Sequence, residues 1–77
     1  MLIQILGTGC AKCQKLEENA TQAATELHLE FRVEKVKELS QIMAFGVMIT
    51  PALAVDGQVK LAGKVPSVED LKKMLAP

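Results

Sequence analysis

The sequence predicts an α/β fold in which helices flank a mixed four-stranded sheet, and three observations predict it. Segments with strand periodicity and segments with helix periodicity follow one another in the order β-α-β-α-β-β-α. Two of the four strand segments are unbroken apolar runs, typical of central strands, whereas the other two alternate apolar with polar residues as edge strands do. Between the last two strand segments, Asp56-Gly57 indicates a two-residue hairpin.

Composition limits the classes of protein that this chain can form. A length of 77 residues predicts a single domain over residues 1–77, and 49% apolar with 23% charged residues is typical of a globular chain. Nine basic residues balance nine acidic ones, so we expect neither nucleic acid nor a membrane surface as a partner. No apolar run is long enough for a membrane span, and no secretory signal is visible, which predicts a cytoplasmic protein.

The first strand and the first helix are joined by a glycine-rich turn. Leu2 to Leu6 is nearly continuous apolar sequence and predicts a central strand. Gly7 and Gly9 let the backbone turn sharply after it. A helix then begins at Cys10 and ends near Glu26, because the small and apolar residues recur every three or four positions: Cys13, Leu16, Ala20, Ala23, Ala24 and Leu27.

The middle of the chain predicts an edge strand and a short helix. The strand runs from Leu29 to Glu34, where apolar residues alternate with charged ones. The helix carries Leu39, Ile42 and Met43, with Ser40 or a neighbour as a possible cap and Gly46 ending it in a left-handed turn. We interpret three methionines as core filler, namely Met43, Met48 and Met74.

The last part predicts a hairpin and a capped helix. Ala52 to Val55 is a second central strand, and Gln58 to Leu61 alternates as its edge partner. Ser67, with Asp70 three residues later, has the spacing of a capping box at the start of the last helix. Its buried stripe consists of Val68, Leu71, Met74 and Leu75. A parallel crossover from the first strand to the second, followed by the hairpin, predicts the spatial strand order 2-1-3-4.

Both cysteines lie where the first helix begins, as Cys10-Ala11-Lys12-Cys13. Unpaired N–H groups and the positive end of the helix dipole stabilise a thiolate at that position. We therefore expect Cys10 to be acidified, with Lys12 adding a positive charge nearby, and Cys13 to face the core and stay protonated. Such a pair fits dithiol–disulfide chemistry.

Taken together, these features resemble the thioredoxin fold. The resemblance covers the whole chain and is greatest for small thioredoxin-like or glutaredoxin-like proteins of archaea and bacteria, which share Gly7-Thr8-Gly9-Cys10 to Cys13 and the Val55-Asp56-Gly57 hairpin. It implies a thiol–disulfide oxidoreductase in which Cys10 is the nucleophile and Cys13 the resolving thiol. It further implies that Pro51 is a cis-proline facing the two cysteines.

The same resemblance suggests ligands and partners. We place substrate contacts at Thr50, Pro51, Lys12 and Gly63, and expect no cofactor beyond a reversible Cys10–Cys13 disulfide. Disulfide-containing proteins would be the substrates, a reductase or a low-molecular-weight thiol the electron donor, and a monomer the working form. The first strand has no carboxylate, only Gln4, to serve as the buried acid that many thioredoxins use.

Two other functions are compatible with a Cys-x-x-Cys motif. Cys10 and Cys13 could hold zinc or a soft metal, as in metal chaperones of ferredoxin-like fold, although those run β-α-β-β-α-β and end on a strand. An interaction module with incidental thiols is the third alternative, and it predicts that Cys10→Ser leaves activity intact.

Overall fold

The computed structural model describes residues 1–76, so one residue of the predicted 1–77 domain lies outside the described residues. The element order is the predicted β-α-β-α-β-β-α. The elements are β1 (Leu2–Leu6), α1 (Ala11–Glu26), β2 (Arg32–Val36), α2 (Leu39–Ala44), β3 (Ala52–Val55), β4 (Gln58–Ala62) and α3 (Val68–Leu75).

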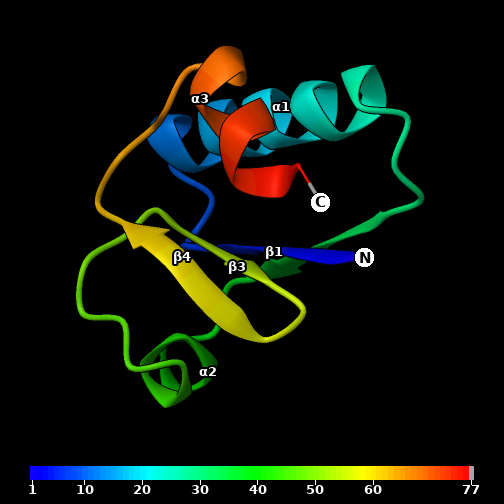
Figure 1. Ribbon diagram of the computed structural model, residues 1–77. Helices are drawn as coiled ribbons and strands as arrows, with labels where there is room; N and C mark the ends of the chain where they lie inside the picture. The colour runs from blue at the N-terminus through cyan, green and yellow to red at the C-terminus, as the bar shows by residue number, and fades with distance from the viewer. Residues whose placement is uncertain (77) are drawn as a thin grey trace.

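The sheet has the predicted strand order, β2-β1-β3-β4. β1 pairs in parallel with β2 and antiparallel with β3, and β3 pairs antiparallel with β4. The two unbroken apolar segments are central because both of their faces are covered by helices. In Figure 1, α1 and α3 lie over one face of this sheet and α2 lies under the other.

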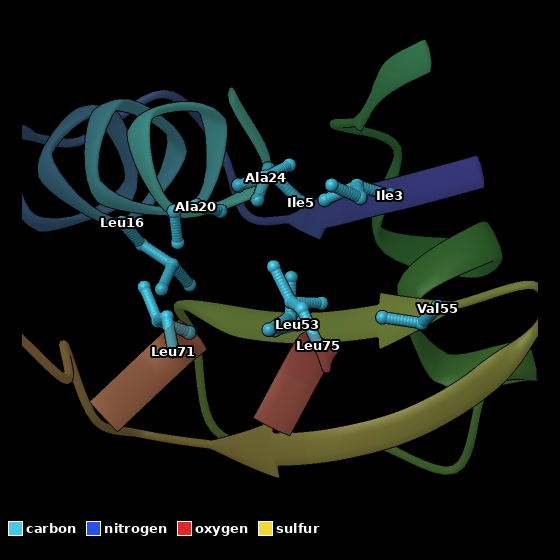
Figure 2. Packing of buried hydrophobic residues seen from close by; sticks show 10 residues of the cluster. Ile3, Ile5, Leu16, Ala20, Ala24, Leu53, Val55, Leu71 and Leu75 are labelled. Carbon is cyan, nitrogen blue, oxygen red and sulfur yellow. The ribbon is translucent and has the colours of Figure 1, made fainter. Parts of the chain in front are cut away.

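The larger core lies between the sheet and the α1/α3 layer. Ile3 and Ile5 of β1 face this layer, and side chains of Leu16, Leu53 and Leu71 complete its centre with no exposed surface. Figure 2 shows Leu16 of α1 and Leu71 of α3 pointing toward one another beside the sheet. Each fully buried leucine contributes roughly 1.5–3 kcal/mol of transfer free energy, so these contacts are what fix α3 on α1.

A smaller core occupies the opposite face of the sheet. It consists of Leu6, Val36, Ile42, Val47 and Ala52, with Phe45 packed against it. Successive residues of a strand point to opposite faces, which is why Leu6 belongs to this core and its neighbour Ile5 to the larger one. α2 and the segment that follows it are therefore held mainly by this second set of contacts.

The β3–β4 hairpin has the predicted two-residue turn. Asp56 and Gly57 both have positive φ, 51° and 86°, as a type I′ turn requires. The Asp56 carboxylate accepts a hydrogen bond from the Leu2 N–H at 2.8 Å. Gln4, nearly buried in β1, donates to Glu34 of β2 at 3.0 Å and accepts from the Gly57 N–H at 3.1 Å. The one polar side chain of β1 is thus committed to holding the hairpin and β2.

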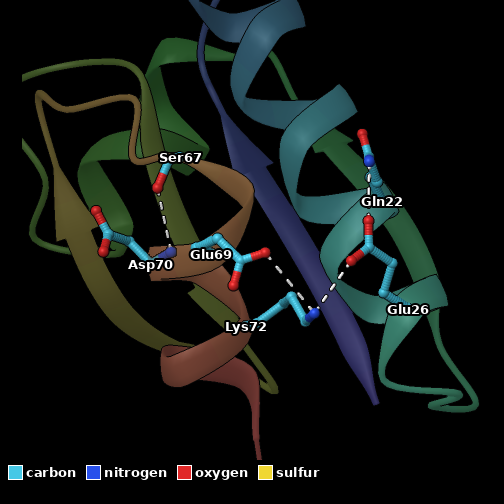
Figure 3. Close-up of polar contacts among 6 residues, drawn as sticks. All are labelled: Gln22, Glu26, Ser67, Glu69, Asp70 and Lys72. Atoms are coloured by element: carbon cyan, nitrogen blue, oxygen red, sulfur yellow. Dashed lines mark hydrogen bonds and ion pairs between the residues drawn. The ribbon is translucent and has the colours of Figure 1, made fainter.

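α3 begins with the predicted cap. The Ser67 hydroxyl accepts a hydrogen bond from the Asp70 N–H at 3.2 Å. Figure 3 shows Lys72 of α3 reaching toward Glu26 of α1, and the two charged groups are 3.1 Å apart. Both side chains are about one-third exposed, so solvent screens this ion pair and it contributes little, and the leucines remain the main attachment.

Some of the predicted boundaries are wrong. The second strand was expected from Leu29, but β2 begins at Arg32, because Arg32 lies opposite Leu2 and β1 does not extend further toward its N-terminal end. Leu29 and Phe31 still pack against the larger core. The cap residue of α2 is Glu38, whose side chain makes no capping hydrogen bond, and Ser40 lies inside the helix.

Candidate active site

The site is built on the turn between β1 and α1. Gly7 continues the β1–β2 ladder by donating to the Val36 carbonyl at 2.9 Å. Gly9 has φ +93°, a backbone conformation that disfavours residues with a Cβ, and it brings the chain round to Cys10. Cys10 is the N-cap residue of α1, and the helix itself begins one residue later than predicted, at Ala11.

The two cysteines lie together at this helix end in different surroundings. Their Sγ atoms are 2.7 Å apart, and the Cys10 Sγ also accepts a hydrogen bond from the Cys13 N–H at 3.3 Å. Cys10 is exposed, whereas Cys13 has only 4% of its surface exposed. The Cys10 sulfur can therefore react with a disulfide of another protein. The Cys13 sulfur can react only with a group that is already bonded to Cys10.

These surroundings move the two pKa values in opposite directions. Hydrogen bonding from the Cys13 side chain and, next, from the Cys13 backbone N–H lowers the pKa of Cys10. Burial is the main cause that raises the pKa of Cys13. Lys12 contributes to the lower Cys10 pKa through its backbone N–H, rather than through the side-chain charge that the sequence suggested. The attacking form of Cys10 is thus favoured while Cys13 retains its proton.

Gly7 is a site residue that sequence reasoning missed. A Cβ at this position would collide with the Cys13 Sγ, and it would lie 3.8 Å from the Cβ of Thr50. Gly7 therefore leaves room for the buried sulfur and lets the Thr50 segment approach the cysteine pair. From the sequence, Gly7 is expected only to let the backbone turn. In the structure φ of Gly7 is not positive, so the turn itself does not require a glycine there. No signal in one sequence separates the two reasons for a glycine.

Thr50 lies beside Gly7, the residue against which the Cys13 sulfur packs. The Thr50–Pro51 peptide bond is cis, Thr50 is exposed and Pro51 is buried. The Pro51 carbonyl accepts a hydrogen bond from the Gly63 N–H at 2.7 Å. Gly63 has φ +76°, and a Cβ there would lie 2.8 Å from Ile49 Cγ2. Gly63 thus supports the segment that precedes β3, and its N–H already donates to Pro51. Lys12, the other residue predicted to contact substrate, is exposed on the first turn of α1.

Apolar side chains gather on the surface next to Thr50. Leu39 and Met43 of α2 are 66% and 63% exposed, and Met48 and Ile49 of the following segment are 96% and 63% exposed. We call these four residues the α2 apolar surface. The interpretation of Met43 and Met48 as core filler is wrong, because the α2 face of the sheet is already covered by Ile42 and Val47.

A metal site has weaker support in this geometry. Within residues 1–76, no group of three or more His, Cys, Asp or Glu side chains is placed to hold a metal ion. Cys10 and Cys13 alone would leave a tetrahedral zinc site two protein ligands short of the four that structural sites use.

An exposed thiol of lowered pKa at a helix N-terminus, paired with a buried thiol on a β-α-β-α-β-β-α fold, defines a thiol–disulfide oxidoreductase of the thioredoxin fold. The thioredoxin domain family matches residues 1–76, and the chain belongs to this family. It is 51% identical over 76 residues to a thioredoxin of Methanothermobacter thermautotrophicus, covering 99% of both chains. It is 39% identical over 75 residues to a thioredoxin of Methanocaldococcus jannaschii, covering 97% of this chain and 86% of that one.

Proposed function

We propose that this protein reduces disulfide bonds of other proteins, with Cys10 as the attacking thiolate and Cys13 as the resolving thiol. The observation that carries the proposal is the asymmetry of the pair: an exposed Cys10 of lowered pKa lies 2.7 Å from a buried Cys13 of raised pKa. The two thioredoxin relatives support the same activity.

The reaction takes two steps. The Cys10 thiolate attacks one sulfur of the substrate disulfide, a Cys10–substrate bond forms, and the other substrate sulfur leaves as a thiolate. The Cys13 sulfur then attacks Cys10, so that the Cys10–Cys13 disulfide forms and the second substrate sulfur leaves with its electron pair. Two electrons have passed to the substrate, and a reductase or a low-molecular-weight thiol must return them before the next cycle.

The substrate is proposed to lie along Thr50 and the α2 apolar surface. A groove of about 220 Å³ is lined by Leu39, Met43, Met48 and Thr50, among others, so the apolar surface is continuous with Thr50, which lies beside Gly7. Exposed apolar patches of this kind mark interaction sites, and this one would remove apolar side chains of a bound substrate segment from water. Pro51 and Gly63 would hold the Thr50 segment in place, and Lys12 would lie at the rim.

The working form is proposed to be a monomeric single domain in the cytoplasm, with no cofactor other than the reversible disulfide. Balanced charge and a family match over residues 1–76 support a single small domain. Among the described residues, none of the helices has both the length and the apolar character to cross a membrane.

The test is a thiol-trapping titration against defined thiol–disulfide buffers, with Cys10→Ser and Cys13→Ser as controls. The wild-type protein should convert reversibly between a dithiol and an intramolecular disulfide. Cys13→Ser should accumulate a stable mixed disulfide with a disulfide-containing protein, because nothing resolves it, whereas Cys10→Ser should form none. Failure of the wild-type protein to form a reversible disulfide, or unchanged activity of Cys10→Ser, would overturn the proposal.

A further inference from the structure

The second step of the proposed reaction needs a proton acceptor. Cys13 is nearly buried and burial raises its pKa, yet it must lose its proton to attack the mixed disulfide. Gln4, the polar residue of the central strand, is an amide with no basic group, and it already bonds Glu34 and Gly57. Another group must therefore accept the proton.

A small cavity adjoins the Cys13 side chain. Its volume is about 80 Å³, and its lining includes Cys13, Gln14 and Glu17 of α1, Lys35 of β2, Lys37 and, from β1, Ile5. A water molecule needs roughly 10–15 Å³ of such space and two to four polar partners. Both conditions are met, so this cavity can carry a proton from the Cys13 sulfur to a polar side chain that also lines it.

Glu17 is the carboxylate placed at this cavity. Residues four apart on a helix share a face, so Glu17 lies one turn beyond Cys13 on the same side of α1. Lys35 lies beside Ile5 in the β1–β2 ladder, and its Nζ is 3.3 Å from the Glu17 carboxylate. The Glu17 side chain is only 27% exposed, whereas that of Lys35 is 53% exposed. The ion pair thus holds the carboxylate beside β2, and both of its residues line the cavity.

We propose that Glu17 accepts the Cys13 proton, through water in this cavity, as Cys13 attacks the mixed disulfide. The Cys13 S–H bond breaks and its proton passes to the Glu17 carboxylate. The sulfur electron pair forms the bond to Cys10, and the Cys10–substrate bond breaks with its electron pair leaving on the substrate sulfur. The protonated Glu17 then returns its proton to that thiolate or to solvent, so atoms and electrons balance.

The charged groups around the cavity are consistent with this assignment. α1 contributes the Cys13 thiol, whose Sγ contacts that of Cys10, and Glu17, while β2 and the residue after it contribute Lys35 and Lys37. β1 contributes only uncharged groups. Glu17 is therefore the one carboxylate among the residues that line this cavity. Lys35 acts as a positioning residue, because it contacts Glu17 and not the sulfur.

The experiment separates the two steps by rate. A symmetrical aromatic disulfide that releases a coloured thiolate is mixed with the reduced protein in a stopped-flow instrument. The first release reports attack by Cys10, and the second reports resolution by Cys13. Both phases are recorded from slightly acidic to alkaline pH for wild type, Glu17→Gln, Glu17→Asp and Glu18→Gln. Glu18 is a neighbouring exposed carboxylate and supplies the matched control.

Glu17→Gln should slow the second phase about tenfold near neutral pH, below the usual 10²–10⁴ of general-base catalysis because solvent also reaches this site. The rate of the first phase should be unchanged. The difference between the second-phase rates of Glu17→Gln and wild type should decrease at alkaline pH, where hydroxide removes the Cys13 proton. Glu17→Asp should recover part of the rate. Equal second phases and pH profiles for Glu17→Gln and Glu18→Gln would overturn the proposal. Since it rests on the proposed function, absence of a second phase in the wild-type protein would instead refute that function.

Discussion

Replacing Gly7 by alanine puts a methyl group against the buried thiol. The new Cβ would collide with the Cys13 Sγ, while its separations of 3.4 Å from the Cys13 Cβ and 3.8 Å from the Thr50 Cβ can be accommodated. The sulfur must therefore move, although Cys13 is nearly buried. Overpacking of this kind costs about 1–3 kcal/mol. At about 2 kcal/mol, the melting temperature of a domain this size falls by roughly 8–16 °C.

The assay is urea and thermal unfolding of the reduced protein, followed by circular dichroism because the chain contains no tryptophan. The control is the same substitution in a Cys13→Ala background. There the colliding sulfur is gone and φ of Gly7 is not positive, so Gly7→Ala should change the stability by less than about 0.5 kcal/mol. The difference between the two backgrounds measures the contact itself. An equal loss of stability in both, or no loss in either, would refute the role assigned to Gly7.

Two further predictions concern the reactivity of Cys10 and the α2 apolar surface. Because hydrogen bonding from Cys13 is the main cause of the lowered Cys10 pKa, alkylation of Cys10 should have a pH midpoint below that of a free thiol, and Cys13→Ala should raise the midpoint; equal midpoints would contradict this. Met48→Lys should lower kcat/KM for a protein disulfide about fivefold, corresponding to about 1 kcal/mol of lost apolar burial, and leave a small aromatic disulfide unaffected. Val59→Lys on the edge strand β4 is its control, and equal effects of the two substitutions would argue against this surface.

Most of the fold could be predicted because short stretches of the sequence indicate which residues are buried. Unbroken apolar runs marked β1 and β3, and Asp56-Gly57 marked the turn between β3 and β4. The start of β2 could not be predicted, because a strand ends where its neighbour ends, and that depends on the register between Leu2 and Arg32. The alternation of apolar and charged residues indicates which side chains face the core. It includes Leu29 and Phe31, which pack against the core although they precede the hydrogen-bonded part of β2.

The site divides in the same way between local and tertiary information. The Cys10–Cys13 spacing and the helix start are local features, and they indicated the chemistry. The contact of Gly7 with the Cys13 sulfur depends on tertiary packing, as does the closeness of Glu17 to Lys35, 18 positions away in the numbering. Met48 was misplaced because its apolar character was equally compatible with a core and with a surface used by a partner.

The two halves of the site are attached to different parts of the protein. Cys10 and Cys13 stand on α1, which is anchored in the larger core, whereas Thr50 lies between Val47 and Ala52 of the smaller one. Local opening costs less free energy where fewer apolar contacts are broken. Local opening of the α2 layer would thus shift the Thr50 segment, the proposed substrate contact, while the sulfurs stay fixed. One rigid dithiol could in this way accommodate disulfides in differently shaped proteins.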